Sequence, residues 1–222
     1  MKEIKMLYKK YGGINTGNQS FTNMPMKIKL SRLEASGRSR IEEIIAKRRS
    51  VRIYKDKKLS ESLISRFLWA AQGISSEDGL RTSPSAGALY PLEIHVVTGE
   101  STELEPGVYR YIPEDYILVQ EISGDIREKL SKAALSQSMI RNAPVSFVIS
   151  AVYSRITGKY GNRGLRYTHM EAGHSAQNIS LLGVELGIGT CTIGAFEDEE
   201  VKNVLKLPPN EEPLYILPLG YI

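Results

Sequence analysis

Apolar residues recur with the period of an α-helix in several segments of the chain. Ser39–Arg49 carries three isoleucines at the i, i+3 and i+4 positions of one helical face. A second helix is predicted to begin after Ser60, a residue type favoured as an N-cap, and to end at Gly73. The same reasoning predicts helices over residues 124–135, 166–187 and 197–207.

Strands are predicted where β-branched and aromatic residues gather between turn-forming residues. Leu92–Gly99, Val145–Tyr153 and Leu214–Ile222 are runs of this kind. Gly107–Ile122 is typical of a hairpin that turns at Pro113–Asp115, since tyrosine, isoleucine and valine flank that turn. Helices and strands do not alternate in a regular βαβ order, and a hairpin requires antiparallel pairing. The pattern therefore predicts an α+β fold with a central, mostly antiparallel sheet.

The composition is that of an ordinary globular protein with a mild excess of positive charge. The 222 residues carry a formal net charge of +4, which suits an anionic ligand but does not require nucleic acid. Residues 1–40 show little apolar periodicity, so we expect a loosely structured arm there and one folded domain over residues 41–222. A single cysteine, Cys191, and the lack of an apolar run of membrane-spanning length favour a cytoplasmic protein that does not enter a membrane.

Three arginines and a serine lie within five residues after the first predicted helix: Arg48, Arg49, Ser50 and Arg52. If the chain is extended there, Arg48, Ser50 and Arg52 project to one side, because side chains alternate along extended backbone. Two guanidiniums and a hydroxyl on one face can hold a phosphate through charge-assisted hydrogen bonds. The alternative is a solvated helix end, which taken alone is the simpler explanation of a charge run.

Two further stretches combine small residues with glycine, which lets the backbone approach a ligand closely. The first, SPSAGALYP, lies just before the strand predicted at Leu92. The second, GIGTCTIGAF, is Gly187–Phe196 and follows the longest predicted helix. Each also has an ordinary explanation, a turn in the first case and a helix C-cap followed by a turn in the second. Neither of the familiar glycine-rich phosphate loops, G-x-G-x-x-G after a strand or G-x-x-x-x-G-K-[ST], occurs in the chain.

Taken together, these motifs resemble the nitroreductase family of flavin enzymes. RRSVR, PSAGALYP and EAGHSAQN…GIGTCTIGAF occur in the family's order, and KYGNRGLRYTHMEAGH (Lys159–His174) is similar to a stretch of the SagB-type dehydrogenases. The resemblance extends from about Ile41 to Ile222. It implies a nitroreductase-like fold that forms a domain-swapped homodimer, with two FMN molecules in the interface and the long helix at the dimer core.

The resemblance also implies which residues contact FMN. They are Arg48, Arg49, Ser50 and Arg52 toward the phosphate, Pro84, Ser85, Ala86 and Gly87 from the partner subunit, and Thr192, Ile193, Gly194 and Ala195 against the isoalloxazine ring. The backbone N–H of Gly194 is the expected donor to flavin N5. Family members usually carry a lysine or arginine after the last strand, where this sequence reads Gly220–Tyr221–Ile222. We therefore expect the arginine cluster to hold more of the phosphate charge alone, or FMN to bind more weakly.

Lys159 and Tyr160 are the expected catalytic residues. Peptide azoline oxidases of this superfamily carry a Lys–Tyr pair in the matching stretch, where it serves as an acid/base for proton removal coupled to hydride transfer. Amines and phenols have ordinary pKa values near 10, so either group must be perturbed to act as a base near neutral pH. The alternative is that the pair only lines the pocket.

The resemblance implies an FMN-dependent oxidoreductase that passes electrons from NADH, NADPH or another donor to a small organic acceptor, or that dehydrogenates a substrate. No metal is expected. The alternative from another functional class is a non-catalytic flavin-binding or storage protein. A nucleic-acid binder is not favoured, because the chain shows no recognition helix, RNP-like strand or zinc motif.

Overall fold

The computed structural model describes residues 38–222. The loosely structured arm predicted for residues 1–40 lies outside this range except for its last three residues. Within the described part of the chain, no helix is both long enough and apolar enough to cross a membrane.

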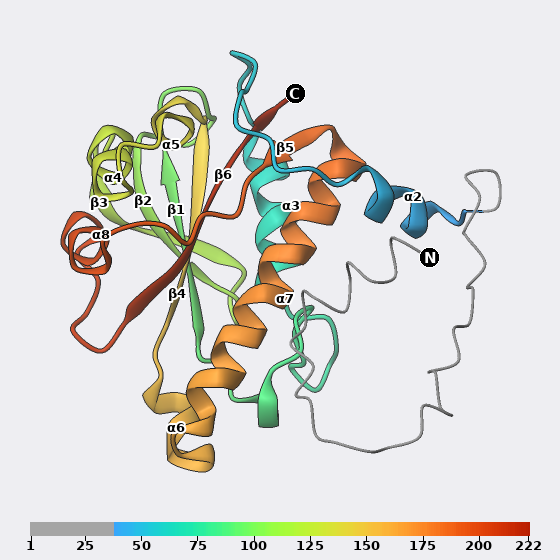
Figure 1. Ribbon diagram of the computed structural model, residues 1–222, viewed down its shortest axis with the longest axis vertical. Coiled ribbons are helices and arrows are strands. Elements are labelled where there is room, and N and C mark those ends of the chain that lie inside the picture. Colours follow the sequence, from blue (N-terminus) through green and yellow to red (C-terminus); the bar gives the residue numbers. More distant parts are fainter. Residues whose placement is uncertain (1–37) are drawn as a thin grey trace, which may run out of the picture. The chain divides into compact units, whose positions relative to one another are not determined.

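A six-stranded sheet forms the centre of the fold, with the strand order β3-β2-β1-β4-β6-β5 (Figure 1). Every pair of neighbouring strands is antiparallel. The strands are β1 (Leu92–Thr98), β2 (Gly107–Ile112), β3 (Ile117–Ser123), β4 (Val145–Ala151), β5 (Ile188–Thr190) and β6 (Glu212–Tyr221). The predicted α+β class and antiparallel sheet are therefore confirmed.

Helices cover both faces of the sheet (Figure 1). On one face α3 and α7 pack on β1 and β4, where the rings of Phe67 and Phe147 meet edge to face at 6.4 Å between centroids. On the other face α4, α5 and α8 cover a second apolar layer around Val148 and Ile216. The helices are α2 (Arg40–Lys47), α3 (Glu61–Gln72), the 3-10 turn η2 (Ala86–Ala88), α4 (Arg127–Ala133), α5 (Ser138–Asn142), α6 (Ser154–Tyr160), α7 (Arg163–Leu186) and α8 (Asp198–Leu205).

The predicted helix ends follow from local chemistry. The Ser60 hydroxyl accepts the N–H of Leu63 at 3.2 Å and so caps α3. Gly187 ends α7 with a left-handed φ of 68°, which glycine adopts at little cost.

Three elements were not predicted. α5 and α6 are too short to show a helical period, and β5 has only three residues and depends on pairing with β6, far along the chain. The predicted strand Val145–Tyr153 ends at Ala151, because the chain turns there into α6, and α7 begins at Arg163, three residues before the predicted start.

A charged cluster buried in the sheet explains a histidine among apolar residues of β1. Nε2 of His95 lies 2.5 Å from Oε1 of Glu211, and Arg110 donates to Oε2 of the same carboxylate over 3.1 Å. Burial alone raises the pKa of Glu211, but the hydrogen bond and charge of His95 outweigh it and hold that pKa at about 2. Burial lowers the pKa of His95, yet Glu121 and Glu211 together raise it above its ordinary value. The cluster is a structural ion network.

Candidate functional site

The arginine cluster lies along β5, next to the second glycine-rich stretch. The helix α2 ends before Arg48, and the chain becomes extended. Ser50 then forms a parallel β-bridge with Thr190, and the N–H of Val51 donates to the carbonyl of Thr190 at 2.9 Å. At the close approach of the two segments, a Cβ added to Gly189 would lie 2.6 Å from a methyl group of Val51. Two stretches about 140 residues apart in the sequence are thus side by side.

No carboxylate within residues 38–222 neutralises this positive charge. The guanidinium of Arg49 donates to the carbonyls of Ala46 and Arg48, at 3.0 and 2.7 Å. The side chains of Arg48 and Arg52 form neither an ion pair nor a hydrogen bond in the described part of the chain. Oγ1 of Thr190, beside them, is buried without a partner there. Guanidiniums without a carboxylate partner can hold a phosphate through charge-assisted hydrogen bonds, so Arg48 and Arg52 fit the phosphate of FMN.

The segment Thr192–Ala195 follows β5 and presents an exposed glycine. Ile193 is buried and pairs with Ile216 through two backbone hydrogen bonds of 2.9 Å. The next residue, Gly194, is exposed, and its N–H makes no hydrogen bond within residues 38–222. A Cβ at Gly194 would lie 3.5 Å from the ring of Tyr215. The pairing of Ile193 therefore fixes a backbone N–H that is free to donate outward.

A pocket of about 300 Å³ opens beside Gly194. The α7 residues His169 and Ala172 form one wall, and residues around the start of β6 form another. Nε2 of His169 lies 2.8 Å from the hydroxyl of Tyr153, and the two rings meet edge to face. The remaining lining residues are Phe196, Asp198, Pro213, Leu214 and Tyr215. The sequence motifs assigned no site role to His169, because only its position in the fold brings it to Gly194.

The predicted loop Pro84–Gly87 lies elsewhere, against α3 and α7. Ser83, just before it, donates to the carbonyl of Ala71 at 2.8 Å and accepts from Nδ2 of Asn178 at 3.2 Å. The loop contains the turn η2, in which Gly87 has a φ of 67°. These contacts hold the loop on the helical layer of the fold.

Lys159 and Tyr160 lie against this loop. A Cβ added to Gly87 would be 2.8 Å from the hydroxyl oxygen of Tyr160 and 3.0 Å from Nζ of Lys159. The positive φ and this contact both favour glycine at position 87. The ring of Tyr160 packs edge to face on Tyr167, with 5.2 Å between centroids. The two expected catalytic side chains therefore belong with the first glycine-containing loop.

The predicted site residues thus form two clusters in one chain. The phosphate-side cluster joins Arg48–Arg52 with Thr192–Ala195, and the loop cluster joins Pro84–Gly87 with Lys159 and Tyr160. Within residues 38–222, no hydrogen bond or ion pair connects the two clusters. Neither cluster alone contains all the groups that the resemblance implies.

Sequence reasoning passed over Glu171, although it lies in the EAGH part of the quoted motif. Its side chain is buried on α7, and burial raises its pKa to about 7. The sequence did carry one indication of its burial. Glu171 lies beside Ala172 and Ser175, so it places an acid within a stripe of small residues on the long helix.

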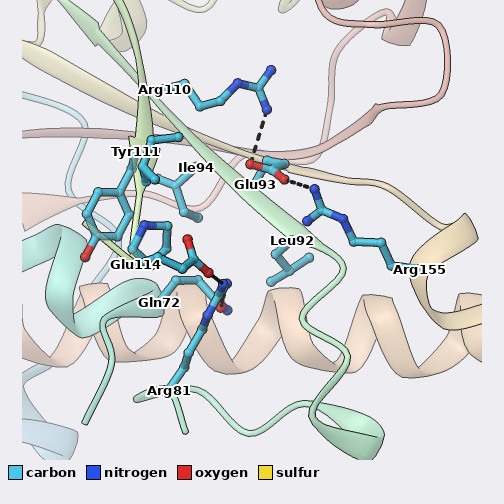
Figure 2. A pocket seen from close by; sticks show the side chains of 11 residues that line it. Gln72, Arg81, Leu92, Glu93, Ile94, Arg110, Tyr111, Glu114 and Arg155 are labelled. Carbon is cyan, nitrogen blue, oxygen red and sulfur yellow. Dashed lines mark hydrogen bonds and ion pairs between the residues drawn. The ribbon is translucent and has the colours of Figure 1, made fainter. Parts of the chain in front are cut away.

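A second pocket, of about 390 Å³, contains none of the predicted site residues in its lining. Figure 2 shows that Arg81 reaches Glu114 there and that Glu93 lies between Arg110 and Arg155. Because each of these arginines is paired with a carboxylate, the pocket lacks the free charge of the phosphate-side cluster.

Sequence comparison gives a family match and two informative relatives. The model of the nitroreductase family matches residues 45–221. A protein of Methanocaldococcus jannaschii, named for the same family, is 45% identical over 181 residues, which cover 82% of this chain and 90% of that protein. The microcin B17-processing protein McbC of Escherichia coli is 27% identical over 142 residues, which cover 57% of this chain and 48% of McbC.

Solved structures agree with the family match. A chain from Anabaena variabilis, also named for the nitroreductases, superposes with a TM-score of 0.71 at 31% identity. The match covers 82% of this chain but only 38% of the Anabaena chain. The NADPH:FMN oxidoreductase of Vibrio harveyi, solved with NAD⁺, superposes with a TM-score of 0.60 at 19% identity, over 82% of this chain and 68% of that one. The similarity to McbC supports the SagB-type branch that the motifs indicated. On these grounds the chain belongs to the nitroreductase family.

Proposed function

We propose that the chain is an FMN-dependent oxidoreductase that works as a homodimer. The observation that carries the proposal is the phosphate-side cluster, where the unpaired guanidiniums of Arg48 and Arg52 lie on the same segment pair as the free N–H of Gly194. A cation pair suits a phosphate, and a fixed backbone donor suits the edge of a flavin ring. The family membership and the Vibrio harveyi oxidoreductase support the same cofactor.

In this proposal the chain's own groups bind and orient FMN. Arg48, Ser50 and Arg52 hold the phosphate, and the Thr192–Ala195 segment lies along the ring. FMN, when bound, supplies the capacity to accept and pass on a hydride. The unpaired N–H of Gly194 would serve as the hydrogen-bond donor to the flavin at N5. Donor and acceptor would use the pocket of about 300 Å³ beside Gly194 in turn.

The two separate clusters support the homodimer. The loop cluster lacks the arginines, and the phosphate-side cluster lacks the loop. The two would form one complete site if one subunit contributed the loop cluster and the other contributed the phosphate-side cluster. Pro84–Gly87, Lys159 and Tyr160 of one subunit would then cover the flavin held by Arg48–Arg52 of the other. The exposed apolar side chains of Ile41 and Trp69 line a groove between α2, α3 and α7, where a second subunit would bury them.

The electron donor is NADH, NADPH or another small reductant, and the acceptor is a small organic molecule. Dehydrogenation of a substrate is a second candidate direction. It is favoured by the place of Lys159 and Tyr160 beside Gly87, where an amine and a phenol can take a substrate proton, and by the similarity to McbC. A flavin-storage protein would need neither of these groups.

Anaerobic mixing of the FMN-loaded protein with NADH or NADPH tests this function. We expect the flavin absorbance to bleach rapidly and to return when a quinone is added. A storage protein would bind FMN but would be reduced no faster than free FMN, and that result would contradict the proposal. For variants of Arg48 or Arg52, the matched control for FMN binding is Arg141→Ala. Arg141 is an exposed arginine on α5, on the face of the sheet opposite to α3 and α7.

A further inference from the structure

Tyr90 has a backbone conformation that is unfavourable for a residue with a large side chain. Its φ is 45°, in the left-handed region that glycine adopts at little cost and other residues rarely adopt. Pro91 follows it, and a following proline favours extended backbone at the residue before it. Such a conformation persists only where its surroundings hold it. The contacts of Tyr90 therefore have to compensate for its strain.

The side chain of Tyr90 reaches back to Arg81, before the Pro84–Gly87 loop. Its hydroxyl accepts the backbone N–H of Arg81 at 3.1 Å. The guanidinium carbon of Arg81 lies 4.5 Å from the centre of the Tyr90 ring, which is within the range of a cation–π interaction. A hydrogen bond and a ring contact thus join the two ends of the segment that contains the loop.

Arg81 is itself held in place by two further side chains. Its Nη1 donates to Oε1 of Gln72 at 3.2 Å, and its Nη2 donates to Oε1 of Glu114 at 2.7 Å (Figure 2). Gln72 is fully buried at the end of α3. Tyr90 is therefore attached to a partner that is fixed to the helical layer.

The backbone of Tyr90 connects the loop to α6. Its N–H donates to the hydroxyl oxygen of Ser85, inside the loop, at 3.0 Å. Its carbonyl accepts from Nη1 of Arg155 at 3.3 Å. Arg155 lies on α6, four residues before Lys159, the first residue of the expected catalytic pair. Tyr90 is thus bonded both to the loop and to the helix that carries this pair.

The loop and α6 meet closely at Gly87. A Cβ added there would lie 2.8 Å from the hydroxyl oxygen of Tyr160 and 3.0 Å from Nζ of Lys159. In an enzyme, a displacement of about 1 Å at the reacting groups can cost about 100-fold in rate. The placement of the loop against α6 is therefore important if the pair is catalytic.

We propose that Tyr90 is a positioning residue: it fixes the Pro84–Gly87 loop against α6 and so places Gly87 beside Lys159 and Tyr160. The value of this placement for catalysis rests on the proposed function, whereas the placement itself is a property of the described chain. The proposal also explains a tyrosine at a left-handed position, because glycine could make neither the hydroxyl contact nor the ring contact with Arg81.

Amide hydrogen exchange of the full-length protein, followed by NMR without FMN or substrate, tests the hydroxyl contact. Tyr90→Phe should speed the exchange of the Arg81 amide by about tenfold, the effect of losing one hydrogen bond. The matched control is Tyr116→Phe. Tyr116 also has a positive φ, of 54°, but its hydroxyl contacts Ser65, so this variant should leave the Arg81 amide unchanged.

Tyr90→Gly separates the side chain from the backbone strain. Glycine relieves the strain and keeps the N–H and carbonyl of position 90, so a loop held by its backbone alone would become no looser. We expect the opposite. The Ala88 amide, which donates to the Ser85 carbonyl at 3.1 Å, should exchange about tenfold faster. The nuclear Overhauser contact between the α-protons of Gly87 and the ring of Tyr160 should weaken, and Tyr90→Phe should retain most of it.

The amides of β4, at the centre of the sheet, report any loss of global stability and should exchange at the wild-type rate in each variant. Unchanged exchange of the Arg81 amide in Tyr90→Phe would overturn the proposal. So would a full Gly87–Tyr160 contact in Tyr90→Gly, or an equal acceleration of the β4 amides. Failure of FMN to bind would affect none of these readings, so the two proposals fail separately.

Discussion

Replacing Glu171 by glutamine should stabilise the protein, by an amount that grows with pH. The pKa of this group is 4.5 in its ordinary state and about 7 in the folded protein, because burial penalises its charge. A carboxyl group with a raised folded pKa contributes its full stability below pH 4.5 and loses it as the pH rises toward 7. Glutamine stays neutral throughout, so it avoids that loss while keeping nearly the same shape.

The size of the effect follows from the two pKa values. Each unit of separation is about 1.4 kcal/mol, so the wild-type protein should lose about 1 kcal/mol at pH 5 and about 3 kcal/mol at pH 8 relative to Glu171→Gln. Urea unfolding at both pH values, at one protein concentration, measures the difference. Glu200→Gln removes an exposed acid on α8 and serves as the control. Equal effects of Glu171→Gln at pH 5 and pH 8, or a larger destabilisation at pH 8, would refute the reasoning.

Three further predictions concern the ion network and the two clusters. Glu211→Gln should destabilise the protein by about 3 kcal/mol at pH 7, because it leaves His95 and Arg110 without their acid. Since the pKa of Glu211 is lowered to about 2, this loss of stability should shrink as the pH falls below 4.5, which urea unfolding at several pH values measures. Arg48→Ala or Arg52→Ala should weaken FMN binding about 10- to 150-fold in fluorescence titrations, the effect of losing a hydrogen bond to a charged group, and Arg141→Ala should not. Lys159→Ala and Tyr160→Phe should leave flavin reduction by a nicotinamide intact but lower turnover about 10²- to 10⁴-fold for a substrate that must lose a proton. Equal losses of turnover with a quinone acceptor would contradict the assignment of these two residues as an acid/base pair.

Local signals predicted most of the fold, and long-range pairing explains what they missed. The caps at Ser60 and Gly187 and the β-forming run at Val145 act within a few residues, so the sequence reveals them directly. The strand β5 forms only because β6 lies beside it, and no local pattern encodes that neighbour. The turn of the chain into α6 likewise depends on packing against α7 rather than on a helical period.

The candidate site shows the same division. The motifs identify the residue types, but the bridge from Ser50 to Thr190 shows which of them lie together in one chain. The assignment of Lys159 to a cluster with Gly87 also needed the fold, because more than seventy residues separate them. Glu171 looked like an ordinary polar position on a long helix until its burial was known.

Titration of the purified, flavin-depleted protein with FMN, followed by absorbance and by light scattering, tests the central claim most directly. The account predicts a yellow complex that saturates at equimolar FMN and chain, with a mass twice that of the 24.7 kDa chain. A folded protein that shows no flavin spectrum at saturating FMN would contradict the cofactor. A monomer that binds FMN fully would contradict a site assembled from two subunits.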